Sequence, residues 1–166
     1  ETIIALATPA GESALAVIRI SGPLSHIIAK EACDCTNPTP RKTYLVDYQS
    51  CDGETLDQVV ITLFNEGKSY TGEDSLEISC HGNPLIIELI SKDLMNRGCR
   101  IAQPGEFTRL AFLNGKIDLP QAESVAQIIG AKNEQALALA QRNLKGKLSS
   151  KQPIPHMGWN KLNINQ

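Results

Sequence analysis

The sequence lacks an excess of either charge and any long apolar run. Its 16 basic and 18 acidic residues leave a formal net charge of −2. The chain as a whole therefore exerts no attraction on nucleic acids, and an RNA contact would have to be local or made through another protein. No apolar stretch approaches the roughly 20 residues that a membrane-spanning helix requires. We expect a soluble protein without membrane contact.

The cysteines lack the regular spacing of a disulfide framework or a zinc site. Their number is odd, the chain shows no signal-peptide pattern, and Cys33-x-Cys35 has no second cysteine or histidine pair nearby. These features predict reduced thiols in a cytoplasmic protein and argue against a structural metal. The five cysteines are Cys33, Cys35, Cys51, Cys80 and Cys99.

A phosphate-binding P-loop is missing as well. The pattern G-x-x-x-x-G-K-[ST] occurs nowhere in the 166 residues. This absence excludes P-loop nucleotide hydrolysis by the chain as it stands. With 42% hydrophobic residues, the chain can still bury one sizeable core plus an appendage, which predicts one or two domains.

Apolar segments separated by turn residues fill the first two thirds of the chain. Asp52-Gly53 between two alternating segments predicts an antiparallel hairpin, and SLEISC at 75–80 predicts a central strand. The predicted elements are strands over 3–7 and 14–20, a helix over about 21–33, strands over 42–49, 56–64 and 75–80, a helix over 84–97, a strand over 99–102 and a helix that Pro104 opens. This order, β-β-α-β-β-β-α-β-α, predicts an α+β domain with a mixed β-sheet and flanking helices.

The pattern changes after the stretch 104–123. Asn114-Gly115 ends a short helix there, and Asp118 is a natural N-cap for the next one. The alanine-rich, amphipathic pattern that follows predicts helix only, with an apolar stripe that no second helix of the chain covers. We therefore expect a truncated helical domain, or one that another copy of the protein completes. The expected organisation is a domain over 1–117, the beginning of a helical domain over 118–150 and an atypical, proline-containing tail over 151–166.

Three charged residues lie where the pattern predicts little charge. Arg19 interrupts the apolar strand 14–20. An arginine in such a strand usually lies on an edge strand or belongs to an ion pair, or else it binds a ligand or carboxylate. Glu77 lies on the strand 75–80, which runs into His81, a glycine turn and a helix N-terminus. Such a junction is a common binding place for small molecules, and Glu77 and His81 could both line it. Lys116 follows the helix stop and is either a solvated lysine or a cation directed at an anionic ligand.

Cys80 and His81 form a second candidate site, a thiol and imidazole pair for nucleophilic catalysis. Adjacent residues of a strand point to opposite faces, so a direct contact between the two side chains is awkward. The simpler interpretation is a core thiol next to a histidine that the backbone satisfies.

Three long motifs, in order and at matching spacing, resemble the N-terminal region of the tRNA modification GTPase family MnmE, also called TrmE. They are ATPAGESALAVIRISGP, SYTGEDSLEISCHGNP and PGEFTRLAFLNGKIDLPQAESV, and the likeness extends from residue 1 to about 150. The resemblance implies a fold like that of tetrahydrofolate-binding domains, a homodimer, and a bound tetrahydrofolate derivative of the 5-formyl or methylene type. It also implies a helical domain that a Ras-like G domain interrupts.

The same resemblance implies partners and chemistry. With an MnmG-type flavoprotein, family members install a carboxymethylaminomethyl-type group on the wobble uridine of certain tRNAs, and the full complex engages the tRNA. GTP, Mg and K belong to the G domain, whose P-loop is missing from this sequence, as is the family's C-terminal cysteine motif. We therefore do not expect the chain to hydrolyse GTP by itself.

Arg19, Glu77 and Lys116 are the positions that match the family's folate contacts. A carboxylate can accept two parallel hydrogen bonds from the N–H donors of an aminopyrimidine, and cations attract the anionic glutamyl tail of a folate. The resemblance thus predicts one folate site made by these three residues, with no catalytic or metal-binding residue. The alternatives are a stand-alone thiol enzyme using Cys80 and His81, and a purely structural dimerisation module.

Overall fold

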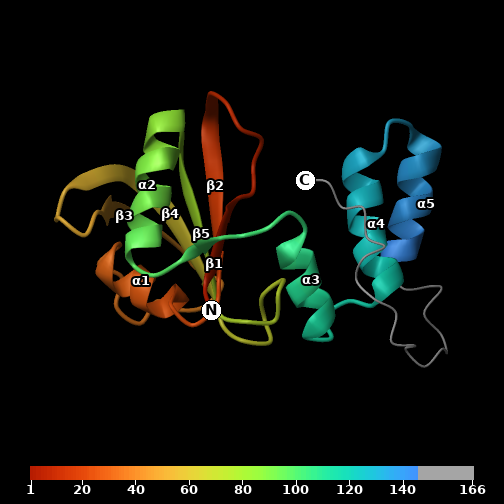
Figure 1. Ribbon diagram of the computed structural model, residues 1–166, viewed down its shortest axis with the longest axis horizontal. Coiled ribbons are helices and arrows are strands. Elements are labelled where there is room, and N and C mark those ends of the chain that lie inside the picture. Colours follow the sequence, from red (N-terminus) through yellow and green to blue (C-terminus); the bar gives the residue numbers. More distant parts are fainter. Residues whose placement is uncertain (146–166) are drawn as a thin grey trace. The chain divides into compact units, whose positions relative to one another are not determined.

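The computed structural model describes residues 1–145. In chain order the elements are β1 (Ile3–Leu6), β2 (Ser13–Ser21), α1 (Ser25–Glu31), β3 (Thr43–Gln49), β4 (Thr55–Phe64), β5 (Ser75–Gly82), α2 (Pro84–Asn96), β6 (Arg100–Ile101), α3 (Glu106–Leu113), α4 (Leu119–Gly130) and α5 (Glu134–Leu144) (Figure 1). The chain divides into two compact units, Glu1–Ala102 and a second unit that begins at Gln103.

The first unit is built on a mixed six-stranded sheet in the order β3-β4-β5-β2-β1-β6. β1 and β6 are parallel, whereas the other neighbouring strands are antiparallel. The predicted α+β class and the predicted order of elements from β1 to α3 are confirmed. Gly53 has a φ of 81° in the β3–β4 hairpin, a conformation that glycine adopts without steric cost.

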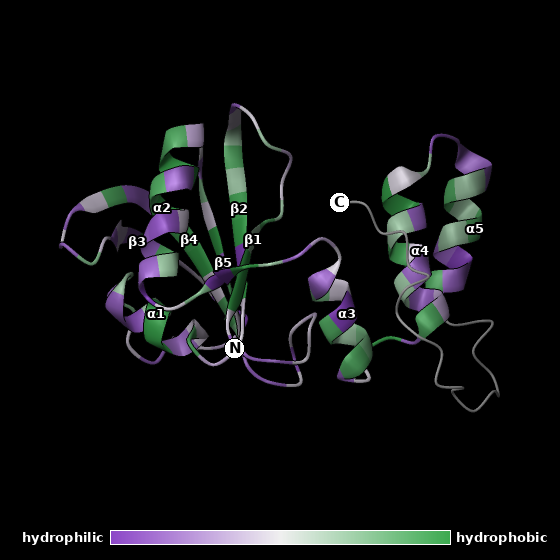
Figure 2. Ribbon diagram, viewed as in Figure 1, coloured by the Kyte–Doolittle hydropathy of each residue, from purple (hydrophilic) through white to green (hydrophobic). Residues whose placement is uncertain are grey.

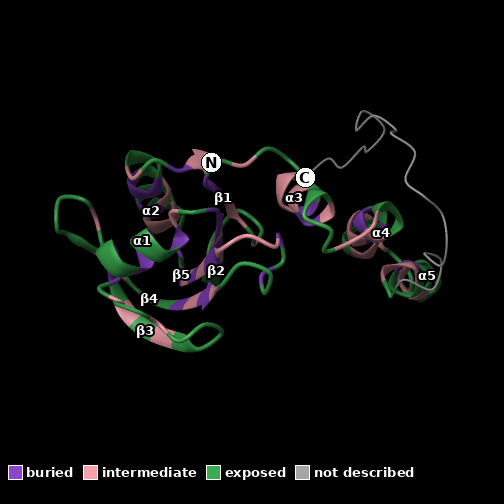
Figure 3. Ribbon diagram, turned by 90° about the horizontal axis from the view of Figure 1, so that it is seen from below, coloured by how far each residue is buried: buried purple, intermediate pink, exposed green. Residues whose placement is uncertain are grey.

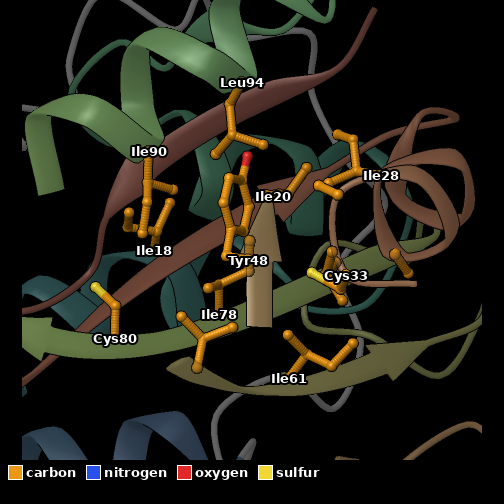
Figure 4. Packing of buried hydrophobic residues seen from close by; sticks show 14 of the residues in the cluster. Ile18, Ile20, Ile28, Cys33, Tyr48, Ile61, Ile78, Cys80, Ile90 and Leu94 are labelled. Atoms are coloured by element: carbon orange, nitrogen blue, oxygen red, sulfur yellow. The ribbon is translucent and has the colours of Figure 1, made fainter. Parts of the chain in front are cut away.

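One face of the sheet forms the hydrophobic core. Ile18 of β2 and Ile78 of β5 are buried there, because alternate residues of a strand point to the same face. In Figure 4 they face Ile90 and Leu94 of α2 and Ile28 of α1. Each fully buried side chain of this size stabilises the fold by about 1.5–3 kcal/mol. β2 is hydrophobic along most of its length (Figure 2).

The opposite face of the sheet is covered by neither α1 nor α2, since both helices contact the core face. The residues at its centre are exposed or half-buried and alternate along the strands with buried ones (Figure 3). We call it the open face, and its central residues are Val17, Arg19, Leu45, Val60, Thr62, Glu77 and Ser79. Any charged side chain of β2 or β5 that avoids the core must lie on this face.

The described part of the second unit is helical and contains a helical hairpin. Asp118 caps α4 as predicted, and it forms a capping box with Gln121. The chain then turns at Ala131, whose backbone is extended, and Asn133 caps α5. α4 and α5 contact each other, and the Gln121 side chain donates a hydrogen bond to the Leu144 carbonyl at 2.8 Å. The expectation that the apolar stripe after Asp118 has no second helix to cover it is therefore wrong.

The division of the chain into units differs from the organisation expected from the sequence. It groups α3 with α4 and α5, whereas the sequence assigned residues 103–117 to the sheet domain. The predicted domain boundaries themselves stay a prediction. The predicted tail over 151–166 and the end of the segment 118–150 lie outside the described residues.

Among the described helices, none is long and apolar enough to cross a membrane.

Candidate functional site

Arg19 and Glu77 form an ion pair at the centre of the open face. They are direct neighbours in the antiparallel ladder between β2 and β5. The Arg19 Nε donates to Glu77 Oε1 at 2.9 Å, and one terminal nitrogen of the guanidinium lies 2.7 Å from the same oxygen. The two side chains are 31% and 32% exposed, so solvent and a ligand can both reach them.

The placement of this pair follows from strand alternation. Ile18 and Ile20 enter the core on either side of Arg19, which leaves the guanidinium no place except the open face. β2 is an inner strand of the sheet, so the interpretation of Arg19 as an edge-strand residue is wrong, and the interpretation as an ion-pair member is confirmed. A pair that is one third exposed contributes about 1 kcal/mol or less to stability. Its contribution to the fold is therefore small.

One oxygen of Glu77 remains available. Both contacts of the carboxylate with Arg19 fall on Oε1. Within residues 1–145, Oε2 has no hydrogen-bond donor. An ionised carboxylate has about four acceptor positions, so Glu77 can accept an N–H group from a ligand while it keeps its bond to Arg19.

Tyr70 lies beside the pair, a residue that sequence reasoning did not single out. The Arg19 guanidinium carbon is 5.7 Å from the centre of the Tyr70 ring, within the range of a cation–π contact. The ring comes from the loop between β4 and β5, which has no periodic pattern, so nothing in the sequence indicated that it points toward Arg19. The SYTGED motif predicted an ordered polar loop and no more.

Lys116 belongs to the second unit. Its backbone N–H donates to the Ala111 carbonyl at 2.8 Å, directly after Gly115, whose φ is 66°. The lysine is exposed and follows the end of α3, as the sequence predicted. The structure thus brings Arg19 and Glu77 together, whereas the convergence of Lys116, a residue of the other compact unit, on the same site stays a prediction.

The Cys80 and His81 side chains do not form a dyad. Cys80 is buried, its thiol donates to the Ala16 carbonyl, and burial raises the pKa of the thiol. His81 lies on the other face, where its Nδ1 is 2.8 Å from Asp57 Oδ1 and its backbone N–H donates to Asp57 Oδ2. A buried thiol with a raised pKa is a poor nucleophile at neutral pH. This geometry argues against the thiol enzyme.

Fold and site together define a class of protein, an α+β domain with a charged pair on the sheet face opposite α1 and α2, followed by helices. A family model described as "GTP-binding protein TrmE N-terminus" matches residues 2–116. The match covers more than half of the chain, which therefore belongs to this family. Arg19, Glu77 and Lys116 all lie within the matched region, and Lys116 is its last residue.

Three curated relatives illustrate the similarity, and each is named tRNA modification GTPase MnmE. The relative from Opitutus terrae is 53% identical over 148 residues, which is 89% of this chain and 32% of the relative. That from Bdellovibrio bacteriovorus is 46% identical, covering 91% of this chain and 32% of the relative. That from Haemophilus ducreyi is 43% identical, covering 91% and 33%. The chain spans about a third of the length of the curated relatives it matches.

Proposed function

We propose that this chain is the tetrahydrofolate-binding and homodimerising region of a tRNA modification GTPase. Family membership supports the general assignment. The observation that carries the folate site is the Arg19–Glu77 pair on the open face, with one carboxylate oxygen available. Lys116 completes the proposed site, from this copy of the chain or from a second one.

The chemistry of the pair suits a reduced pterin. The aminopyrimidine edge of a pterin presents neighbouring N–H donors, which Glu77 can accept with Oε2 and the outer side of Oε1. The glutamyl tail is anionic, and Lys116 supplies a cation for it.

The open face also supports the proposed homodimer. Leu45 of β3 and Val60 of β4 are exposed there, and they are neighbours in the ladder between these strands. Exposed aliphatic residues next to a polar site are typical of a surface that another protein covers. A second copy of the chain is the occupant that we propose.

The wider activity rests on the parts of such proteins that this chain does not contain. In the proposed assembly, an MnmG-type flavoprotein performs the redox chemistry while this domain presents the one-carbon unit of a 5-formyl- or methylene-tetrahydrofolate. The product is the modified wobble uridine of a tRNA in the cytoplasm. GTP, Mg and K are then required by the G domain of the complete protein.

Calorimetric titration tests the folate site. 5-Formyl-tetrahydrofolate is titrated into the purified chain, into Glu77→Ala and into the control Glu88→Ala. Glu88 also pairs with a cation, Lys92, but on the surface of α2. A lost charged hydrogen bond costs about 1.5–3 kcal/mol, so Glu77→Ala should bind about 10- to 100-fold more weakly, and the control should bind like the unaltered chain. A dimer that releases no heat with any folate would instead support the structural dimerisation module.

A further inference from the structure

The loop that carries Tyr70 is fixed against the sheet by buried hydroxyl groups. The Thr71 and Ser21 hydroxyls are 2.7 Å apart, and both residues are buried. The Ser21 hydroxyl also lies 2.7 Å from a Glu73 carboxylate oxygen. The loop is closed by a hydrogen bond from the Gly67 N–H to the Gly72 carbonyl at 2.8 Å. A loop held in this way presents its side chains in fixed positions, because the hydroxyls cannot move without losing buried hydrogen bonds.

Tyr70 is not needed for the core. It is 38% exposed, whereas Tyr48 is fully buried among the core residues. The Tyr70 ring instead borders the Arg19–Glu77 pair, with the guanidinium 5.7 Å from its centre. An aromatic ring that stays exposed beside a charged pair, on a loop built to hold it, offers a flat surface next to a hydrogen-bonding edge.

We infer that Tyr70 is the surface on which the ring of the ligand stacks when Glu77 holds its edge. This inference rests on the proposed folate site. It assigns to Tyr70 a contact with the pterin ring of the ligand and none with the glutamyl tail. Hydrogen bonds to Glu77 fix the ring in its plane, and they leave the two faces of the ring uncovered. Tyr70 covers one of these faces by offset stacking, and the glutamyl tail does not use it.

Three ligands and two variants test the inference. The ligands are 5-formyl-tetrahydrofolate, pterin, which is the ring without the tail, and p-aminobenzoylglutamate, which is the tail without the pterin. The variants are Tyr70→Phe, which keeps the ring, and Tyr70→Leu, which removes it at similar bulk. Stacking of a base on an aromatic side chain is worth about 1–3 kcal/mol, so Tyr70→Leu should weaken binding of the first two ligands about 10-fold. The affinity for p-aminobenzoylglutamate should not change, and Tyr70→Phe should bind all three within about twofold of the unaltered chain.

Tyr44→Leu is the matched control. Tyr44 also lies beside a cation, with Lys42 Nζ 5.4 Å from its ring centre, but it points to the other face of the sheet. This control should bind every ligand normally, and circular dichroism should show native folding for all variants. If the unaltered chain binds no folate, the proposed function fails and the inference fails with it. Two results would overturn the stacking inference alone, provided that the unaltered chain binds folate. One is that Tyr70→Leu binds 5-formyl-tetrahydrofolate as tightly as the unaltered chain. The other is that its affinity for p-aminobenzoylglutamate falls as much as its affinity for pterin.

Discussion

Asp93 is a buried carboxylate of α2 that is held by three hydrogen-bond donors. It is 5% exposed and accepts three hydrogen bonds of 2.7 Å, from the Tyr48 hydroxyl, the Cys51 backbone N–H and the Arg97 Nε. These bonds join α2 to the hairpin of β3 and β4. Burial raises the pKa of Asp93, but the hydrogen bonds from Arg97, Tyr48 and Cys51 outweigh burial and leave the pKa below its ordinary value.

Removing this carboxylate should destabilise the first unit strongly. Asp93→Ala removes the acceptor of the Tyr48 hydroxyl and the buried partner of Arg97 Nε, and breaking a buried pair costs about 3–5 kcal/mol. Glu88→Ala is the control, since Glu88 and Lys92 form an exposed pair with the same i,i+4 spacing on the same helix. Urea unfolding followed by circular dichroism measures both variants. Equal midpoints for the two would contradict the prediction.

The same carboxylate gives stability a definite pH dependence. Its pKa is lower in the folded than in the unfolded state, where it is about 3.9. Its contribution is therefore complete above about pH 4 and is lost as the pH falls through the lower folded pKa. The difference in unfolding free energy between the unaltered chain and Asp93→Asn should shrink from pH 6 to pH 3. A difference that stays constant over this range would show that Asp93 does not titrate as described.

At the scale of single residues, the sequence revealed charges only where they interrupt an apolar pattern. Arg19 and Glu77 stood out because their strands alternate cleanly, and their pairing is confirmed. Asp93 did not stand out, because Asp93–Arg97 and Glu88–Lys92 have the same spacing on α2 and only burial distinguishes them. Tyr70 was missed because a loop has no period that predicts where a side chain points.

At the scale of elements, the capping box of α4 is a local feature with a measurable contribution. Asp118 accepts the Gln121 backbone N–H at 2.9 Å, and the Gln121 side chain accepts the Asp118 N–H at 2.9 Å. Asp118→Ala should lower the stability of α4 by about 1 kcal/mol, whereas Asp118→Ser keeps an acceptor and should have little effect. Amide hydrogen exchange in the first turn of α4 measures both. Equal exchange in the two variants would contradict a capping role.

Turn chemistry and strand alternation predicted most elements, because both are local signals. Asp52-Gly53 predicted the β3–β4 hairpin, and Asn83-Pro84 marks the start of α2, where the Asn83 side chain accepts the Leu85 N–H. The interruption between α4 and α5 was missed, although Asn133 is a good N-cap. The apolar spacing continues across the break, so the periodic signal concealed the point at which the chain turns back.

At the scale of the whole molecule, the open face predicts the oligomeric state. Leu45 is 67% exposed on this face, and Leu85 of α2 is 61% exposed on the helix-covered side. A charge at the centre of an apolar contact is costly, so Leu45→Asp should convert the proposed homodimer into a monomer, whereas Leu85→Asp should remain dimeric. Sedimentation equilibrium measures both masses. A dimer that survives Leu45→Asp would place the contact elsewhere.

Family membership could be recognised from three motifs because they lie, in order, near the beginning, in the middle and at the end of the matched region 2–116. The arrangement of Arg19 against Glu77 follows from the register of two strands and is confirmed. The position of Lys116 relative to this pair depends on how separate units, or separate copies, assemble. No local pattern contains that information, so the three-residue site remains a proposal.

The Arg19–Glu77 pair also limits how far the electric field of the site extends. Opposite charges less than 3 Å apart cancel each other beyond a short distance. An approaching anion therefore experiences little long-range attraction from the pair, and its capture depends on encounters at close range. The association rate of an anionic ligand should therefore depend on ionic strength only through other cations, such as Lys116. This dependence should be weak, because solvent ions screen an exposed charge within about 10 Å at 0.1 M salt.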